Sequence, residues 1–499
     1  MKFLRFRSFL TEEKMSEKLE LAEKRMAEIQ AQIASSEEQK KLLPRFHFSS
    51  PCGWINDPNG FCFFDGEFHL FAQWHPYSTR WGPMHWCHAS SKNLVKWKTL
   101  PPAIAPDSQA DSEGCFSGSA IEHCGKLFIV YTGVSEKTDS TIQNQCVAFF
   151  DGKKFVKPNF NPILTANEIP FEYETEHFRD PKIWRDGEKF FLAAVLKKKD
   201  GHGALVFFES ADFEKWNFLG IADEEKTSQS AMWECPDIFS LGGKSVFIVS
   251  PQEMHAEKKG GFNKGNNTVY LFGEFKKDEC KFVREKSDFT MLDLGMDFYA
   301  AQTMQDFSGR RIMIAWMQNW DSYNTPKNYL WSGMMTFPRE LKIENGKLIQ
   351  MPVREIENFY GEKIVGKITG KKNFSLRHCA LKLKIIPKRG SLEMLNVKIG
   401  GEKQFAFFEF DGEKMELSFN RENTIEGGGA MNKKSICVEL DENGELNLLC
   451  LIDTSSLEIF INGGEKVFTN NFFISSEENS LALSSTFFNA VEFSLNEIL

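Results

Sequence analysis

The stretch DGEKFFL at residues 186–192 is one of five similar units that decide the fold. Each unit has a turn containing Gly, then Glu, Lys or Arg, then an apolar strand. This pattern is typical of a β-hairpin whose glycine adopts a positive φ. The other four read DGEFHLF at 65–71, CGKLFIV at 124–130, GGKSVFIV at 242–249 and SGRRIMIAW at 308–316. The glycines, Gly66, Gly125, Gly187, Gly243 and Gly309, are 59, 62, 56 and 66 residues apart.

A second marker repeats with the same period. Trp97, Phe155 and Trp216 are 58 and 61 residues apart and lie between the glycine turns. Two independent markers with a period of about sixty residues predict a five-bladed β-propeller. The repeats stop near residue 345, and from 366 short alternating strands such as LKLKI (381–385) and LEIFING (457–463) predict an antiparallel β-sandwich.

The fold class is therefore all-β, with a short N-terminal helix. We expect a helical extension over 1–44, the propeller over 45–350 and the sandwich over 366–499. Apolar residues of the extension form one narrow helical stripe of Met15, Leu19, Ala22, Met26, Ile29 and Ile33. We expect this helix to dock on its own chain, and a dimerisation helix is the alternative. The chain is accordingly expected to be a monomer or a homodimer.

Composition limits the partners. Sixty Lys plus Arg face 69 Asp plus Glu, a net charge of −9, which argues against nucleic acid because such proteins need a basic face. No apolar run of about 18 residues and no export signal are found, so we expect no membrane partner and a cytoplasmic location. The 11 Cys are an odd number without CxxC pairs, which favours reduced thiols over a disulfide framework or structural zinc.

Unusual polar residues precede each glycine turn, where the preceding strand is expected. Equivalent strands of a propeller take equivalent places around the axis. If this strand is the innermost one, these side chains converge on one mouth of the central channel. They are Asp57, Ser117, Asp180, Glu234 and Asp297, which lie 9, 8, 7, 9 and 12 residues before the respective glycines.

Convergence would place several carboxylates in a partly apolar funnel with Trp54, Trp81 and Phe116. Burial and mutual repulsion would raise the pKa of at least one carboxyl. An acid kept protonated beside an ionised partner is what glycosidic-bond cleavage needs, without a cofactor or metal. Alone, Asp57 and Asp180 would be turn residues because each precedes proline.

Three further groups have simpler interpretations. We interpret Asp237, which follows proline, as a turn cap. Asp297 is balanced between ligand contact and structural hydrogen bonding. Cys235 is expected to be a buried thiol.

At these residues the sequence resembles the β-fructofuranosidases of glycoside hydrolase family thirty-two, which include invertases and sucrose-6-phosphate hydrolases. The motifs GWINDPNG, FAQWHP, WGPMHW, FSGS, FRDPK, WECPD, DFYAAQT and FPREL occur in family order from Phe46 to Glu340. LEIFINGGEKVFT resembles the family's C-terminal sandwich motif. Departures such as His75 and Pro83 lie at the expected pocket rim and bear on the leaving group rather than on the chemistry.

The resemblance implies a role for each matched residue. Asp57 is the expected nucleophile, Glu234 the general acid and base, and Asp180 the residue that holds fructose hydroxyls, with Arg179 helping to keep Asp180 ionised. Matched substrate contacts are Trp54, Asn56, Gln73, Trp81, Phe116, Ser117 and Arg179. Because the family retains anomeric configuration, the carboxyl groups of Asp57 and Glu234 are expected to be about 5–5.5 Å apart.

The sequence thus predicts a glycosidase that removes terminal β-D-fructofuranosyl groups from sucrose or sucrose 6-phosphate. Two alternatives stay open. One is fructan hydrolysis or fructosyl transfer at the same site. The other is a sugar-binding propeller without activity, which we would expect to lack one of the three acidic residues.

Overall fold

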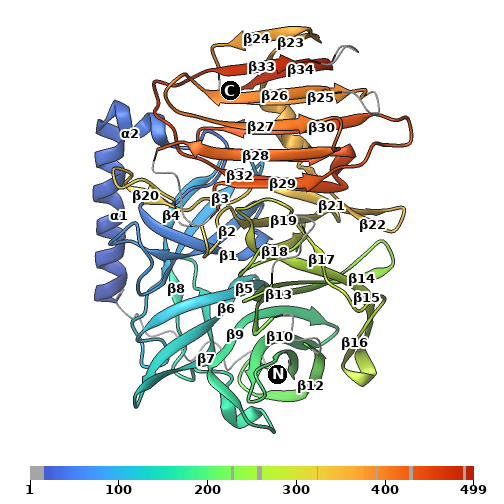
Figure 1. Ribbon diagram of the computed structural model, residues 1–499. Helices are drawn as coiled ribbons and strands as arrows, with labels where there is room; N and C mark the ends of the chain where they lie inside the picture. The colour runs from blue at the N-terminus through green and yellow to red at the C-terminus, as the bar shows by residue number, and fades with distance from the viewer. Residues whose placement is uncertain are drawn as a thin grey trace.

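The computed structural model describes residues 16–225, 230–255, 261–322, 324–376, 378–387, 392–425, 431–486 and 491–499. Five sheets surround an axis and two further sheets pack above them, so the expected five-bladed propeller and β-sandwich are confirmed (Figure 1). The sheets change over between β22, which ends at Pro352, and β23, which begins at Tyr360. No helix in these ranges is long and apolar enough to cross a bilayer.

Each blade is an antiparallel meander whose first strand lies innermost. Blade one has β1 (Gly53–Phe64), β2 (Glu67–His75), β3 (His85–Ser91) and β4 (Lys98–Ile104), with β20 (Trp331–Ser332) parallel to β1. Blade two has β5 (Gly114–His123), β6 (Lys126–Lys137), β7 (Ser140–Phe150) and β8 (Phe155–Val156). Blade three has β9 (Tyr173–Asp186), β10 (Lys189–Lys198), β11 (Gly203–Ser210) and β12 (Trp216–Glu224).

The last two blades follow the same plan. Blade four has β13 (Met232–Leu241), β14 (Lys244–Gln252), β15 (Val269–Lys276) and β16 (Lys281–Arg284), with β17 (Thr290–Met291) also beside β15. Blade five has β18 (Tyr299–Gln305), β19 (Arg311–Trp316), β21 (Arg339–Glu344) and β22 (Lys347–Pro352). The innermost strands β1, β5, β9, β13 and β18 contact one another in a closed ring.

The sandwich has two six-stranded sheets. One has the order β23 (Tyr360–Ile368), β34 (Val491–Ile498), β25 (Cys379–Ile385), β30 (Leu446–Asp453), β31 (Ser456–Ile461) and β32 (Lys466–Asn471). The other has β24 (Gly370–Phe374), β33 (Leu481–Ser485), β26 (Met394–Gly400), β27 (Phe405–Asp411), β28 (Glu416–Asn423) and β29 (Lys433–Cys437). Short 3₁₀ turns lie at η2 (Ala166–Glu168), η3 (Lys277–Glu279), η4 (Arg354–Phe359) and η5 (Asn462–Gly464).

Both sequence markers have a structural cause. The five glycines occupy the turns between the first and second strand of each blade, and all have φ between 59° and 86°. A side chain is strained there, so glycine recurs. The aromatic marker falls at the outermost strand: Phe155 begins β8, Trp216 begins β12 and Trp97 directly precedes β4.

Every innermost strand contains a β-bulge at the same level. The pairing register shifts between Ile55 and Pro58 in β1, and likewise at 115–118, 179–182, 234–237 and 299–302 in the other four. A bulge bends a strand and re-aims its side chains. The five bulges therefore form a ring near the beginning or middle of the innermost strands.

The N-terminal helix docks on the propeller. Helix α1 (Glu17–Ser35) buries Leu19, Ala22, Met26, Ile29 and Ile33, and the last four of these pack with Phe46, Phe48 and the core of blade one. It runs along the side of the propeller before the short α2 (Glu37–Leu42) (Figure 1). The expected docking on its own chain is confirmed, whereas Met15 lies outside the described residues.

Buried thiols match the cysteine prediction. All 11 Cys lie in the described ranges, and none of them forms a disulfide. Nine are at least partly buried, and burial raises the pKa of thiols such as Cys87 and Cys379.

Candidate active site

The carboxylate of Asp57 lies at the bulge of β1 and is held by neighbouring donors. Asn56 Nδ2 donates to Oδ1 at 3.1 Å, and Oδ2 accepts from Gln73 Nε2 at 2.9 Å and from Ser117 Oγ at 2.6 Å. Gln73 comes from β2 and Ser117 from the bulge of β5. Side chains from two blades therefore fix one buried carboxylate at the ring of bulges.

Asp180 meets Asp57 through Cys235. The backbone N–H of Cys235 donates to Asp180 Oδ2 at 2.8 Å. The Cys235 thiol lies 3.5 Å from Asp57 Oδ2 and 3.6 Å from Asp180 Oδ2. Asp180 has φ +62° and Cys235 has φ +50°, so both bulges adopt the left-handed region that turns a side chain out of the regular ladder.

Glu234 is the neighbour of Cys235 and completes the group. Its Oε1 accepts a hydrogen bond from Arg179 Nε at 3.1 Å and forms an ion pair with Nη2 at 3.0 Å, and its Oε2 accepts from the Tyr299 hydroxyl at 2.6 Å. The Arg179 guanidinium thus binds Glu234 rather than Asp180. Its positive charge also opposes the rise in the pKa of Asp180, as expected of a residue that helps to keep Asp180 ionised.

Electrostatics single out Asp180. Burial raises the pKa of its carboxyl to about 7, and the negative charges of Glu234 and Asp57 add to the rise while Arg179 opposes it. The expected carboxyl with a raised pKa is therefore Asp180. Near neutral pH the protonated and ionised forms of Asp180 are therefore present in comparable amounts.

Aromatic side chains surround the carboxylates. The buried Trp54 ring packs at 23° to Trp320 with centroids 6.0 Å apart, and its Nε1 donates to Asn56 Oδ1 at 2.9 Å. Trp81 is 51% exposed and meets Phe116 edge-on at 6.2 Å. Trp81 thus offers an accessible flat apolar face beside Phe116.

Two acidic residues have structural partners instead. Asp297 is buried in an ion pair with Arg421 of the sandwich, 2.6 Å away, and also accepts from Ser322 and from the Asn471 backbone. Asp237 is buried within β13, where Lys182 pairs with it at 2.9 Å, so the turn-cap interpretation was wrong. The ion pair with Lys182 compensates the buried charge of Asp237, whereas in a turn the Asp237 carboxylate would face solvent.

Sequence reasoning missed Tyr299 and undervalued Cys235. The signal for Tyr299 was spacing: Asp297 lies 12 residues before Gly309, outside the 7–9 of the other blades, whereas Tyr299 lies 10 before it. No sequence pattern indicated the contacts of Cys235, because they depend on a β-bulge that cannot be predicted from residue types. Among the described residues, no group of three or more His, Cys, Asp or Glu is arranged to hold a metal ion.

Comparison with known proteins agrees with this architecture. Residues 47–352 match the model for the glycosyl hydrolases family 32 N-terminal domain, and residues 357–496 match that for the family's C-terminal domain. The chain belongs to glycosyl hydrolase family 32. It is therefore a glycosidase, and the resemblance seen in its motifs is confirmed.

Particular relatives cover almost the whole chain. It is 34% identical over 454 residues to a sucrose-6-phosphate hydrolase of Escherichia coli, covering 89% of this chain and 91% of the relative. A sucrose-6-phosphate hydrolase structure from Lactobacillus gasseri has a TM-score of 0.84 at 27% identity, covering 95% and 96% of the two chains. A mutant Bombyx mori β-fructofuranosidase in complex with sucrose also has a TM-score of 0.84, at 29% identity and coverage of 96% and 98%.

Proposed function

We propose that this protein is a retaining β-fructofuranosidase that cleaves sucrose or sucrose 6-phosphate. The observation that carries the proposal is the joining of Asp57 and Asp180 through Cys235, with Glu234 next in sequence. Glycosidic-bond cleavage with retention needs a carboxylate nucleophile and a carboxyl acid on opposite sides of one bond.

The reaction runs in two displacements. Asp57 attacks the anomeric carbon of fructose while Glu234 gives a proton to the departing oxygen, so a fructosyl–Asp57 ester forms and the leaving sugar departs neutral. Glu234, now a carboxylate, takes a proton from water, and that water cleaves the ester. Glu234 is protonated again and Asp57 is free, so the protons balance over one turnover.

Neighbouring side chains support these roles. Asn56, Gln73 and Ser117 donate to Asp57, which orients its carboxylate for attack. Asp180 would bind fructose hydroxyls, and its ionised form would stabilise positive charge developing on the sugar ring. Arg179 and Tyr299 orient Glu234.

The sugar would lie against the aromatic rim. Trp54, Trp81 and Phe116 offer apolar faces for its C–H groups. Of these, Trp81 is the most accessible, since half of its surface faces solvent.

The substrate class is supported by relatives. The Escherichia coli and Lactobacillus gasseri proteins are named for sucrose 6-phosphate, and the Bombyx mori structure holds sucrose. Both substrates present the same fructosyl group to Asp57. Rates on sucrose, sucrose 6-phosphate and inulin, with analysis of transfer products, would separate hydrolysis of either disaccharide from fructan hydrolysis or fructosyl transfer.

The roles are tested by Asp57→Ala and Glu234→Gln. Each should lower kcat by about 10²–10⁴-fold or more while the circular dichroism spectrum stays unchanged. Glu274→Gln is a matched control, because Glu274 is exposed on β15 of the same blade as Glu234. NMR should show that the fructose first released has retained configuration. Near-normal turnover in either variant, or inverted product, would overturn the assignment.

A further inference from the structure

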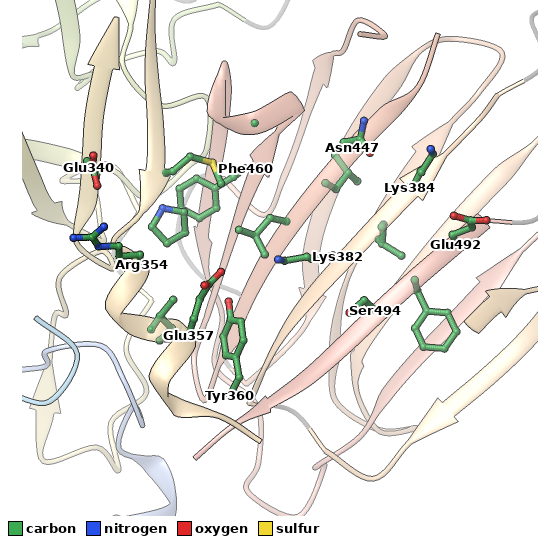
Figure 2. A pocket seen from close by; sticks show the side chains of 18 of the residues that line it. Glu340, Arg354, Glu357, Tyr360, Lys382, Lys384, Asn447, Phe460, Glu492 and Ser494 are labelled. Atoms are coloured by element: carbon green, nitrogen blue, oxygen red, sulfur yellow. The ribbon is translucent and has the colours of Figure 1, made fainter. Parts of the chain in front are cut away.

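A large cavity lies away from the carboxylates, where blade five meets the sandwich. It has a volume of about 1120 Å³ and shares no residue with the site at the ring of bulges. One wall comes from β21, β22 and η4, and the other from the outer face of the sheet that contains β23, β34, β25, β30 and β31 (Figure 2). We call this cavity the interdomain cleft.

The interdomain cleft is locally positive in an acidic protein. Six of its lining residues are Lys or Arg and three are Glu, whereas the whole chain has a net charge of −9. Four of the six cations have carboxylate partners, as in the pair of Lys384 with Glu445 at 2.8 Å. Within the described residues, the side chains of Lys382 and Arg354 have no hydrogen bond or ion pair. The unpaired charge therefore favours an anionic group.

A carboxylate and two hydroxyl groups line the interdomain cleft with these cations. Lys382 projects into the middle of the interdomain cleft towards Glu357 and the hydroxyl of Tyr360 (Figure 2). Burial, with the charge of Glu357 as a smaller cause, raises the pKa of Tyr360 to about 12, so its hydroxyl stays a donor. The buried hydroxyl of Ser494 has no hydrogen-bond partner among the described residues. A ligand with several hydroxyl groups could pair with all of these.

Part of the interdomain cleft is apolar. Leu449, Met351 and Pro352 line it and are half-buried, and the buried Phe460 packs in one cluster with Leu449 and Met351. Binding sites for small organic molecules combine such a wall with a few converging polar groups. Inorganic phosphate alone would leave this wall and the unpaired hydroxyls unused.

We propose that the interdomain cleft binds a phosphorylated sugar. Lys382 and Arg354 bind the phosphate, Glu357, Tyr360 and Ser494 bind sugar hydroxyls, and the ring lies on the apolar wall at Leu449 and Met351. Such a ligand would bind independently of the substrate that occupies the carboxylate site.

Calorimetric titration of the full chain with glucose 6-phosphate tests the proposal. Lys382→Glu and Arg354→Glu should each weaken binding about tenfold or more, since each removes a charge-assisted contact. The matched control is Lys433→Glu, because Lys433 is exposed on β29 of the opposite sheet and does not line the interdomain cleft. Thermal unfolding and the rate on sucrose should be the same in all variants, which separates this site from the catalytic one.

Glucose and inorganic phosphate are the companion probes. Both should bind at least about tenfold more weakly than glucose 6-phosphate, because each lacks half of the contacts. Equal affinity for glucose would refute the role of the cations, and equal affinity for phosphate would refute recognition of the sugar. Undetectable binding, or binding that both charge reversals leave unchanged, would overturn the proposal even if sucrose is hydrolysed.

Discussion

A buried histidine should make the joint between propeller and sandwich sensitive to alkali. Both ring nitrogens of His47 face carboxylates: Nδ1 lies 2.8 Å from Asp453 Oδ2 and Nε2 lies 2.8 Å from Glu458 Oε1. Burial alone would lower the pKa of His47, but the hydrogen bonds and charges of the two carboxylates raise it to about 9. Glu458 also binds Arg339 of blade five at 2.6 Å. The charged imidazole therefore ties the chain entering blade one to the β30–β31 hairpin of the sandwich.

The magnitude follows from linkage. A histidine pKa near 6.5 in the unfolded chain and about 9 in the folded chain corresponds to about 3 kcal/mol of stability. Because the folded pKa is raised, this stabilisation is complete below about pH 6.5 and is lost as pH rises through 9. The free energy of unfolding should fall by about 1.4 kcal/mol per pH unit in that window from this group alone.

His47→Gln removes the titrating charge and leaves two buried carboxylates without it. Urea unfolding at about pH 6 should show a loss of about 3–5 kcal/mol against the wild type, and the difference should shrink by about 3 kcal/mol at about pH 10. His202→Gln, in the turn between β10 and β11, is the control for replacing a histidine away from this joint. A constant difference between His47→Gln and the wild type at both pH values would refute the reasoning.

Three further outcomes are expected. Tyr299→Phe removes the 2.6 Å hydrogen bond to Glu234 and should lower kcat about tenfold with little change in KM, and an unchanged kcat would mean that Tyr299 does not position Glu234. If Asp180 acts ionised, kcat/KM on sucrose should rise with pH through about 7, because burial raises its pKa; a flat profile between about pH 5 and 7 would exclude that role. Ile29→Glu puts a charge into the contact between α1 and blade one and should cost about 2–4 kcal/mol in urea unfolding, whereas Leu21→Glu, at a half-exposed position of α1, should cost little; a loss of sedimentation mass without a loss of stability would instead indicate a dimer contact.

The propeller could be predicted because its markers are backbone requirements. A turn that needs a positive φ selects Gly66 and its four equivalents, whatever the neighbouring residues do. The shared strand position of the carboxylates could be predicted as well, because residues at a similar distance before equivalent turns lie on equivalent strands. Their convergence needed only the ring closure that a propeller supplies.

Partners of the carboxylates could not be predicted in the same way. Whether Arg179 reaches Glu234 or Asp180 depends on which way a bulge turns each side chain, and a shift of one residue reverses the face. Asp297 has the same residue type as Asp57 but does not join the carboxylate group, because it forms an ion pair with Arg421 of the sandwich. Contacts of that kind depend on how two domains pack, which local spacing does not report.

The β-bulge of blade five differs from those of blades three and four in the side chain that it carries. Ala300 has φ +55°, close to the values of Asp180 and Cys235 in blades three and four, but its methyl group has no chemistry to offer. A register shift is present in the innermost strand of every blade, whereas a positive φ within the shift occurs at Asp180, Cys235 and Ala300, in blades three, four and five. One backbone conformation therefore carries a carboxylate in blade three, a thiol in blade four and a methyl group in blade five, so the bulge geometry does not depend on the side chain that it presents.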